Sequence, residues 1–407
     1  MASLSNEFGI TTTPSKVTQF LEHIMKRNLE LIAQGKPEER IVPCIWGASG
    51  IAKTSMVKQF EKRGITLKDK LVYPKVVHIA LAQLEEAGDI TTGLPITSVD
   101  AQGRPITAYA PPEWWPTLEM TENGARPVIL LFDDFNRADP RILKAIMQIL
   151  QDYRSNVHVL PDNCHIMLTG NPPTGDDGSE YMVNEIDKAI LTRMVHITMT
   201  FDKIDWSIWA QSEGVDDRVI SFVLTYPELV SGLGSHRTNP RSIVQLAKLI
   251  QGTSTDKENH ELINMLASSC LDDGVVQTFL KFTLGDLQKL VSPEDILSDW
   301  KKAEKRLDAL KKRATEGSDS KVRTDLIGII TDRMYVYLMQ DGLVLEEKHY
   351  AAFLSFIKRT DLLPRDLMYA LLRRLRRDCK TPSQNRLITE LITHGGADVA
   401  KMIMEIV

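Results

Sequence analysis

Apolar residues follow two different spacings along the first half of the chain, and the two spacings alternate. Continuous or alternating apolar runs, typical of strands, are IVPCIW (41–46), KVVHIALA (75–82), PVILLFDD (127–134), CHIMLTG (164–170) and VHITMTF (195–201). Apolar residues at helical spacing occupy 14–34, 54–63 and 138–154, with Pro14 and Pro140 at helix starts and Gly64 at a helix end. Strands that alternate with helices predict a parallel α/β sheet, here of five strands.

The pattern changes near residue 200, where strands end and helical spacing continues almost to the C-terminus. KKAEKRLDALKKR (301–313) has few apolar positions, which predicts a solvated helical face. LLRRLRRDCK (371–380) could bind nucleic acid or an acidic partner, but its leucines favour an amphipathic helix that packs against the protein. No aromatic residue interleaves with its arginines, which disfavours stacking on single-stranded nucleic acid.

Composition indicates an ordinary globular protein. The chain has 407 residues, 43% of them hydrophobic, and a net charge of -5, which gives no general attraction to nucleic acid without ruling out local contacts. The N-terminus does not resemble a secretion signal and no long apolar run occurs, so we expect a cytoplasmic protein without a membrane span. Four cysteines lie far apart, which argues against a zinc site or a disulfide framework and predicts structural burial: Cys44, Cys164, Cys270 and Cys379.

The stretch IVPCIWGASGIAKTS (41–55) is close to the phosphate-binding pattern G-x-x-x-x-G-K-[ST] and lies between a predicted strand and a predicted helix. Lys53 would reach the β and γ phosphates and Thr54 would hold Mg²⁺. Ala52 replaces the second glycine, which is tolerated at a negative φ and strained at a positive one. A chance turn of small residues remains the alternative. The expected nucleotide-binding residues are Gly47, Ala48, Ser49, Gly50, Ile51, Ala52, Lys53, Thr54 and Ser55.

Polar residues at the ends of later strands extend this pattern. Asp133 ends the buried run PVILLFDD, where a carboxylate would hold Mg²⁺ through water, and Asp134 follows it. Asn171 leaves the strand CHIMLTG and Arg193 precedes the last strand. Each is weak evidence alone, because strand ends are usually polar and two carboxylates can simply cap a turn. Their order along the chain makes the nucleotide-site hypothesis stronger.

Together these segments resemble a MoxR-like AAA+ ATPase over roughly residues 15–290. WGASGIAKTS resembles the Walker A loop, LLFDDFNRA the Walker B segment, TGNPP sensor 1, LTRM the arginine-finger segment and NPRSIVQLAKLI the sensor 2 helix. GDITTGLPITSVDAQGRPITAYAPPEWWP resembles the insert of this group, a hairpin that engages or moves a partner. A long packed loop is the alternative for this segment.

The resemblance implies an AAA+ P-loop NTPase core with a helical lid and a helical C-terminal region. The expected domains are 1–200, with the insert at about 84–118, then the lid at 201–292 and the C-terminal region at 293–407. The catalytic residues that it implies are Asp134, Asn171, Arg241 at the start of the sensor 2 helix, and Arg193 supplied by a neighbouring subunit. Arg137 is a second candidate for that trans contact, with a structural ion pair as the alternative.

The function implied is an ATP- and Mg²⁺-dependent, chaperone-like motor that forms a homo-oligomeric ring, a hexamer by resemblance. The family often works with a von Willebrand factor A-like partner or in metalloprotein maturation. Asp134 replaces the family's glutamate and is one methylene shorter, which leaves both normal hydrolysis and slow hydrolysis with intact binding open. Two alternatives stay open: a nucleotide-gated scaffold with negligible hydrolysis, and a DNA-acting motor of phage or replication type.

Overall fold

The computed structural model describes residues 8–67, 70–155, 158–173, 183–184, 186–231, 237–254, 259–287, 290–312, 324–340 and 342–404. The chain divides into two compact units, Met1–Phe201 and Asp202–Val407. The second unit contains both the expected lid and the expected C-terminal region. A separate boundary near residue 292 therefore stays a prediction.

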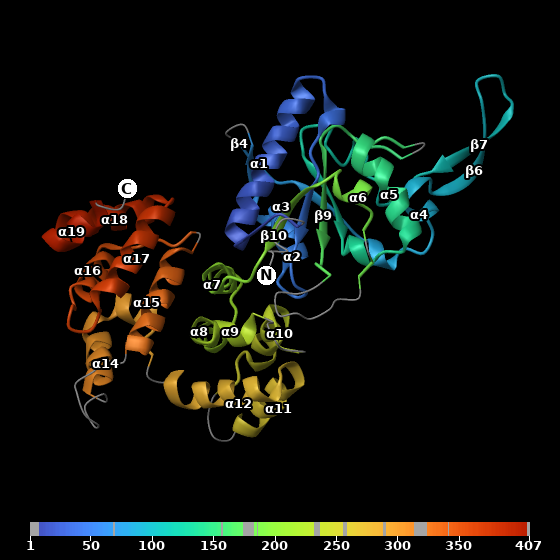
Figure 1. Cartoon of the computed structure of the whole chain (residues 1–407). Helices are drawn as coiled ribbons and strands as arrows, with labels where there is room; N and C mark the ends of the chain where they lie inside the picture. Colours follow the sequence, from blue (N-terminus) through green and yellow to red (C-terminus); the bar gives the residue numbers. More distant parts are fainter. Residues whose placement is uncertain are drawn as a thin grey trace. The chain divides into compact units, whose positions relative to one another are not determined.

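The first unit is built on a parallel sheet of six strands in the order β1-β10-β2-β9-β8-β5 (Figure 1). These strands are β1 (Ile10–Thr12), β2 (Pro43–Trp46), β5 (Lys75–Ala80), β8 (Val128–Asp133), β9 (Cys164–Gly170) and β10 (Val195–Met199). Five of them lie where the apolar runs predict strands, so the α/β fold class is confirmed. The sixth, β1, is only three residues long and mostly exposed, which is too short to give a periodic signal.

Helices cover both faces of this sheet, and the two faces carry separate apolar cores. One core packs α1 (Pro14–Ala33), α2 (Lys53–Lys58) and α3 (Phe60–Arg63) against the sheet. The other packs α5 (Pro140–Asp152). Residues of β8 alternate between the two cores: Ile129 and Leu131 face the first and Leu130 faces the second. This two-sided burial explains why β8 reads as a continuous apolar run.

The helix ends follow their local sequence signals. Asp139 accepts a hydrogen bond from the Arg141 N–H and caps α5, whose first residue is Pro140, as predicted. The single helix predicted for 54–63 forms two segments that meet at Gln59. It ends at Gly64, which has a φ of 71°. The first unit also contains the short helices α4 (Gly88–Thr91) and α6 (Lys188–Leu191).

Two antiparallel hairpins, which the apolar pattern did not predict, extend from the first unit. One pairs β3 (Ile65–Leu67) with β4 (Lys70–Val72). The other lies in the expected insert and pairs β6 (Leu94–Val99) with β7 (Pro105–Ala110). Figure 1 draws this second hairpin projecting away from the sheet. Its large side chains are exposed: Leu94, Ile96, Val99, Ile106 and Tyr109.

Every described element of the second unit is a helix. These are α7 (Lys203–Ser212), α8 (Asp217–Thr225), α9 (Pro227–Val230), α10 (Pro240–Ile250), α11 (His260–Cys270), α12 (Asp273–Lys281), α13 (Pro293–Ser298), α14 (Trp300–Lys312), α15 (Thr324–Leu338), α16 (Glu347–Ile357), α17 (Arg365–Asp378), α18 (Pro382–His394) and α19 (Ala397–Met404). A π-helical turn, Phe282–Asp286, follows α12.

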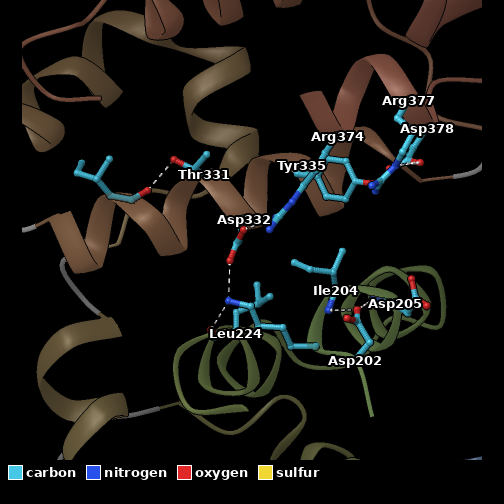
Figure 2. Close-up of polar contacts among 12 residues, drawn as sticks. Asp202, Ile204, Asp205, Leu224, Thr331, Asp332, Tyr335, Arg374, Arg377 and Asp378 are labelled. Atoms are coloured by element: carbon cyan, nitrogen blue, oxygen red, sulfur yellow. Dashed lines mark hydrogen bonds and ion pairs between the residues drawn. The ribbon is translucent and has the colours of Figure 1, made fainter. Parts of the chain in front are cut away.

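One carboxylate joins the first helix of this unit to two later ones. Asp332 on α15 accepts hydrogen bonds from Lys203 Nζ at 2.8 Å and from Arg374 Nη1 on α17 at 2.7 Å (Figure 2). Farther along the same helix pair, the Tyr335 hydroxyl donates to Asp378 at 2.7 Å. Lys203, Asp332 and Arg374 are all partly shielded from water, so their two ion pairs stabilise the packing of α7, α15 and α17 more than exposed pairs would.

The arginine-rich segment forms α17, and its leucines Leu371, Leu372 and Leu375 are buried. The amphipathic-helix interpretation is therefore confirmed. The charged helix α14 also buries an apolar stripe at Ala303 and Leu307, so the expectation of a solvated face holds for only part of its surface.

The structure bears on two further expectations, the burial of the cysteines and the lack of a membrane span. All four cysteines are free thiols, with Cys44 and Cys164 buried and Cys270 and Cys379 only partly buried. Across the described residues, no helix has the length and apolar character needed to cross a bilayer.

Candidate functional site

The strand order brings three chain segments to one edge of the first unit's sheet. β2 pairs with β9, and β9 pairs with β8, all in parallel, so the carboxyl ends of these strands are neighbours. The loop 47–52 follows β2, Asn171 follows β9, and Asp133 ends β8. Open parallel sheets bind ligands at such an edge, where the strand order reverses.

The loop after β2 turns sharply into α2, which begins at Lys53. Gly47 and Gly50 have φ values of 154° and 82°, and a Cβ on Gly47 would lie 2.6 Å from the Met199 carbonyl oxygen. Glycine is therefore required at position 47 by both conformation and space. The Ile51 side chain is buried in the core beneath the loop, whereas Ser49 and Ser55 are exposed.

Lys53 is 6% exposed, and its ammonium group ties the loop to β9. It donates hydrogen bonds to the carbonyl oxygens of Gly47 at 2.8 Å and Ala48 at 3.0 Å. It also donates to Asn171 Oδ1 at 2.9 Å. The lysine and the asparagine, predicted separately from the sequence, are thus in direct contact.

Ala52 has a positive φ, which is the strained one of the two backbone conformations that the sequence left open. Its φ and ψ are 75° and 26°, in the left-handed region that glycine adopts freely. An L-residue with a Cβ pays about 1–2 kcal/mol there. The loop therefore keeps the backbone shape of the glycine-containing pattern although the glycine is absent.

Asp133 collects hydrogen bonds from three side chains. Thr54 Oγ1 donates to its Oδ1 at 2.7 Å, and Thr169 Oγ1 donates to the same oxygen. His78 Nε2 lies 2.9 Å from its Oδ2. Burial would raise the pKa of this carboxyl group, but the hydrogen bonds from Thr169, Thr54 and His78 outweigh burial and lower the pKa below its usual value. Asp133 is therefore held as a carboxylate beside Thr54.

Asp134 follows directly and has a φ of 48°, which turns the chain out of β8. Its Oδ1 accepts a hydrogen bond from Asn171 Nδ2 at 3.0 Å, so Asn171 contacts both Lys53 and Asp134. Asn136 fixes the backbone of Asn171: its Nδ2 donates to the Asn171 carbonyl oxygen at 2.6 Å. Asn171 thus connects the loop cation to the second carboxylate.

Arg193 lies at the opposite edge of the sheet from the loop. It precedes Val195, which starts β10 and pairs with Pro43 at the amino end of β2. β10 has five residues and spans roughly 16 Å, which is farther than an arginine side chain reaches. The guanidinium hydrogen-bonds to Gln151 Oε1 at 3.0 Å and to the Ala189 carbonyl oxygen. Arg193 therefore does not take part in the site of its own chain.

The other two arginines are exposed. Arg137 ends the turn after Asp134. Arg241 lies in the second unit, at the start of α10, where Asn239 and Ser242 form a capping box as the sequence suggested for Asn239. Its position within its own unit is clear, and its role at the nucleotide site stays a prediction.

Four residues of this site were missed from the sequence: His78, Thr169, Asn136 and Lys58. Thr169 and His78 lie inside strands and read as ordinary members of apolar runs. Lys58 Nζ lies 3.2 Å from His78 Nδ1 and looked like a solvated helix residue. Of the four, only Asn136 could have been found from the sequence, because its place in FNRAD matches the Walker B pattern.

The donor set suits Mg²⁺ only in combination with a ligand. The described residues contain no group of three or more His, Cys, Asp or Glu side chains that could hold a metal ion. Thr54 and Asp133 nevertheless place a hydroxyl and a carboxylate oxygen 2.7 Å apart. Mg²⁺ typically binds one or two protein oxygens together with substrate phosphates, so this pair fits it.

Comparisons with known proteins add little to this geometry. No protein-family model matches the sequence, and no curated protein matches it significantly. Among solved structures, one match is the crystal structure of a provisionally assigned ATPase from Cytophaga hutchinsonii. The match covers 89% of this chain and 94% of that chain at 13% identity, with a TM-score of 0.29. A TM-score this low assigns neither fold nor function.

The fold assignment rests on the sheet itself. The loop strand β2 lies inside the sheet between β10 and β9, and β8 and β5 complete one side. This order, with the candidate site at the carboxyl ends of β2, β9 and β8, fits the core of an AAA+ P-loop NTPase.

The strain at position 52 gives a prediction about stability. Ala52→Gly removes a Cβ from a left-handed backbone, so the relief of about 1–2 kcal/mol should equal or exceed the entropic cost of a glycine, about 0.5–1 kcal/mol. We expect an unchanged or higher free energy of unfolding in urea denaturation.

Ala48→Gly in the same loop is the matched control. Ala48 is not among the described residues with positive φ, so the substitution brings no relief there. It should lower the free energy of unfolding. Equal destabilisation by both substitutions would contradict the assigned strain.

Proposed function

We propose that the first unit binds ATP with Mg²⁺ and hydrolyses it to ADP and phosphate. One observation carries this proposal: the first two residues of α2, directly after the loop, contact polar residues at two neighbouring strand ends. Lys53 contacts Asn171 after β9, and Thr54 contacts Asp133 at the end of β8. A chance turn of small residues would not require these partners.

Lys53 would carry the main attraction for the β and γ phosphates. Its ammonium is already at the loop, bonded to the Gly47 and Ala48 carbonyl oxygens. Phosphate oxygens are charged acceptors and form stronger hydrogen bonds with an ammonium than carbonyl oxygens do. The loop amides after Gly47 would hold the same phosphates.

Thr54 and Asp133 would hold Mg²⁺, Thr54 through its hydroxyl oxygen and Asp133 through water. Bound Mg²⁺ would neutralise charge that develops on the transferring phosphoryl group. Thr169 and His78 fix the Asp133 carboxylate from two other directions. The lowered pKa of Asp133 keeps this group ionised, as a role beside a cation requires.

Asp134 would orient the attacking water and accept its proton, and Asn171 would position Asp134. The carboxylate is one methylene shorter than the family's glutamate. A displacement of about 1 Å can cost on the order of a hundredfold in rate. A nucleotide-gated scaffold with negligible hydrolysis is therefore the rival that this substitution favours.

We further propose that the chain acts as a subunit of a ring, a hexamer by its resemblance to MoxR-like AAA+ ATPases. The location of Arg193 at the far sheet edge supports a contact with a neighbour's γ phosphate, and Arg241 would approach the nucleotide from the lid. By the same resemblance, the ring would remodel a protein partner through the exposed β6–β7 hairpin, with a von Willebrand factor A-like protein as the expected class. A DNA-acting motor is an outcome that ATPase assays with and without DNA would reveal.

The first prediction tests nucleotide binding. Lys53→Ala removes the loop cation, and each lost charge-assisted hydrogen bond costs about 1.5–3 kcal/mol. The Kd for fluorescently labelled ATP, measured by titration, should therefore rise by roughly a hundredfold or pass beyond detection. Lys62→Ala, an exposed lysine on α3, is the charge control and should bind like the parent. Parent-like binding by Lys53→Ala would refute the proposed site.

The second prediction concerns Asp134. Asp134→Glu restores the longer reach and should keep or raise kcat in a steady-state phosphate-release assay. Asp134→Asn cannot accept the proton and should lower kcat by about a hundredfold or more while ATP stays bound. If all three proteins turned over at one rate, Asp134 would have no catalytic role.

The third prediction concerns the shared site. Arg193→Ala should lower kcat by ~10³ with little change in ATP affinity, because a finger supplied in trans acts on the transition state. Mixing inactive Arg193→Ala with inactive Lys53→Ala should restore part of the activity. In mixed rings, some interfaces combine an intact loop with an intact finger. A mixture that stays inactive although mixed rings form would move the finger elsewhere, with Arg137 as the next candidate.

A further inference from the structure

Two residues outside the sequence motifs approach Asp133 through a chain of contacts. His78 lies on β5 beside β8, and its Nε2 is 2.9 Å from Asp133 Oδ2. Lys58, the last residue of α2, places its Nζ 3.2 Å from the other ring nitrogen, Nδ1. α2 also carries Thr54, which bonds the other oxygen of the same carboxylate.

Sheet geometry explains why these residues meet. Side chains alternate between the two faces of a strand, and His78 pairs in register with Leu131, two residues before Asp133. Leu131 belongs to the core beneath α1, α2 and α3, so His78 and Asp133 share the face that α2 covers. The contact is therefore fixed by strand register and by the placement of α2.

The chemistry of the two contacts determines which ring nitrogen carries the proton. An ammonium group can only donate, so Nδ1 of His78 must accept from Lys58. A carboxylate can only accept, so Nε2 must carry the proton and donate to Asp133. A neutral His78 with its proton on Nε2 satisfies both partners, whereas the other tautomer satisfies neither.

We propose that Lys58 and His78 form a positioning pair that holds the Asp133 carboxylate in the orientation needed for Mg²⁺–nucleotide. This inference rests on the proposed ATP site. His78 fixes Oδ2, which leaves Oδ1 directed at Thr54, and Lys58 fixes the tautomer and the orientation of the ring. Neither residue is among the proposed nucleotide contacts, so both would act through Asp133. Partners that orient a metal ligand typically affect metal affinity by 10- to 100-fold.

The experiment measures ATP binding twice for each protein, once in EDTA and once across a Mg²⁺ titration, with fluorescently labelled ATP. For His78→Leu, binding in EDTA should match the parent, because Lys53 and the loop are intact. The Mg²⁺ concentration that gives half of the Mg²⁺-dependent increase in ATP affinity should rise by about tenfold or more. His78→Gln keeps an N–H donor on a side chain of similar reach and should behave like the parent.

Lys58→Met tests the second member of the pair and covers the case in which His78→Leu fails to fold, because Lys58 is exposed. It should shift the Mg²⁺ dependence in the same direction by a smaller factor. Lys62→Met removes the same charge from α3 and should leave the Mg²⁺ dependence unchanged.

Several results would overturn the proposal. Parent-like Mg²⁺ dependence of His78→Leu would remove His78, and a shift as large for His78→Gln would show that the ring acts only by packing. Identical curves for Lys58→Met and Lys62→Met would remove Lys58. If the parent bound no ATP in either condition, the proposed function would fail together with this inference. If the parent bound ATP in a Mg²⁺-dependent way and His78→Leu and Lys58→Met showed the same Mg²⁺ dependence, the positioning pair alone would be refuted.

Discussion

The candidate site depends on the buried ammonium group of Lys53, which holds the loop against the end of β9. Lys53 is 6% exposed and donates to two loop carbonyl oxygens and to the amide oxygen of Asn171. Removing a charge from water costs several kcal/mol, and neutral acceptors offset only part of that cost. A phosphate oxygen would offset more, because ion–ion attraction is strong where the dielectric constant is low. In the proposed function, a phosphate group of ATP would supply that anion.

That arrangement depends on the order of the strands, which the sequence does not contain. The motifs predict a phosphate loop, a carboxylate and an asparagine, each at a strand end. Chain order alone would put β5 next to β2, but β9 lies there instead, with β8 beyond it. Only this crossover puts Asn171 between Lys53 and Asp134. The sequence therefore predicts the identity of the site residues, whereas the contacts among them come from the topology.

Other features escaped prediction for related physical reasons. His78 is a polar residue at a half-exposed strand position, and its importance comes from a neighbouring strand and a helix that are distant in sequence. The φ of Ala52 depends on how the loop closes between β2 and α2, and residue identity alone allows either sign. The apolar pattern also missed β6 and β7, because they lack a buried face and so lack the period-two signal of a half-buried strand. Only the family resemblance pointed to a hairpin there.

Arginines in the described part of the chain differ in the partners they have, and this bears on whether one chain makes a complete site. Arg374 and Arg359 are bound to carboxylates within their own unit, so their charge already stabilises the fold. Arg193 instead contacts an amide oxygen and a backbone carbonyl oxygen, and within the described part of the chain it forms no ion pair.

An arginine bonded only to neutral groups keeps most of its attraction for an incoming anion. Arg193 could exchange its two hydrogen bonds to neutral groups for a bidentate contact with a phosphate. That contact is stronger because both partners are charged. Arg193 lies beyond reach of its own loop, so that phosphate would have to be held by another molecule. The sheet thus gathers Lys53, Asp133 and Asn171 at one edge and carries Arg193 at the other, where it could serve the proposed site of a neighbouring subunit. This polarity agrees with the proposed ring, in which head-to-tail contacts would let each subunit complete the site of the next.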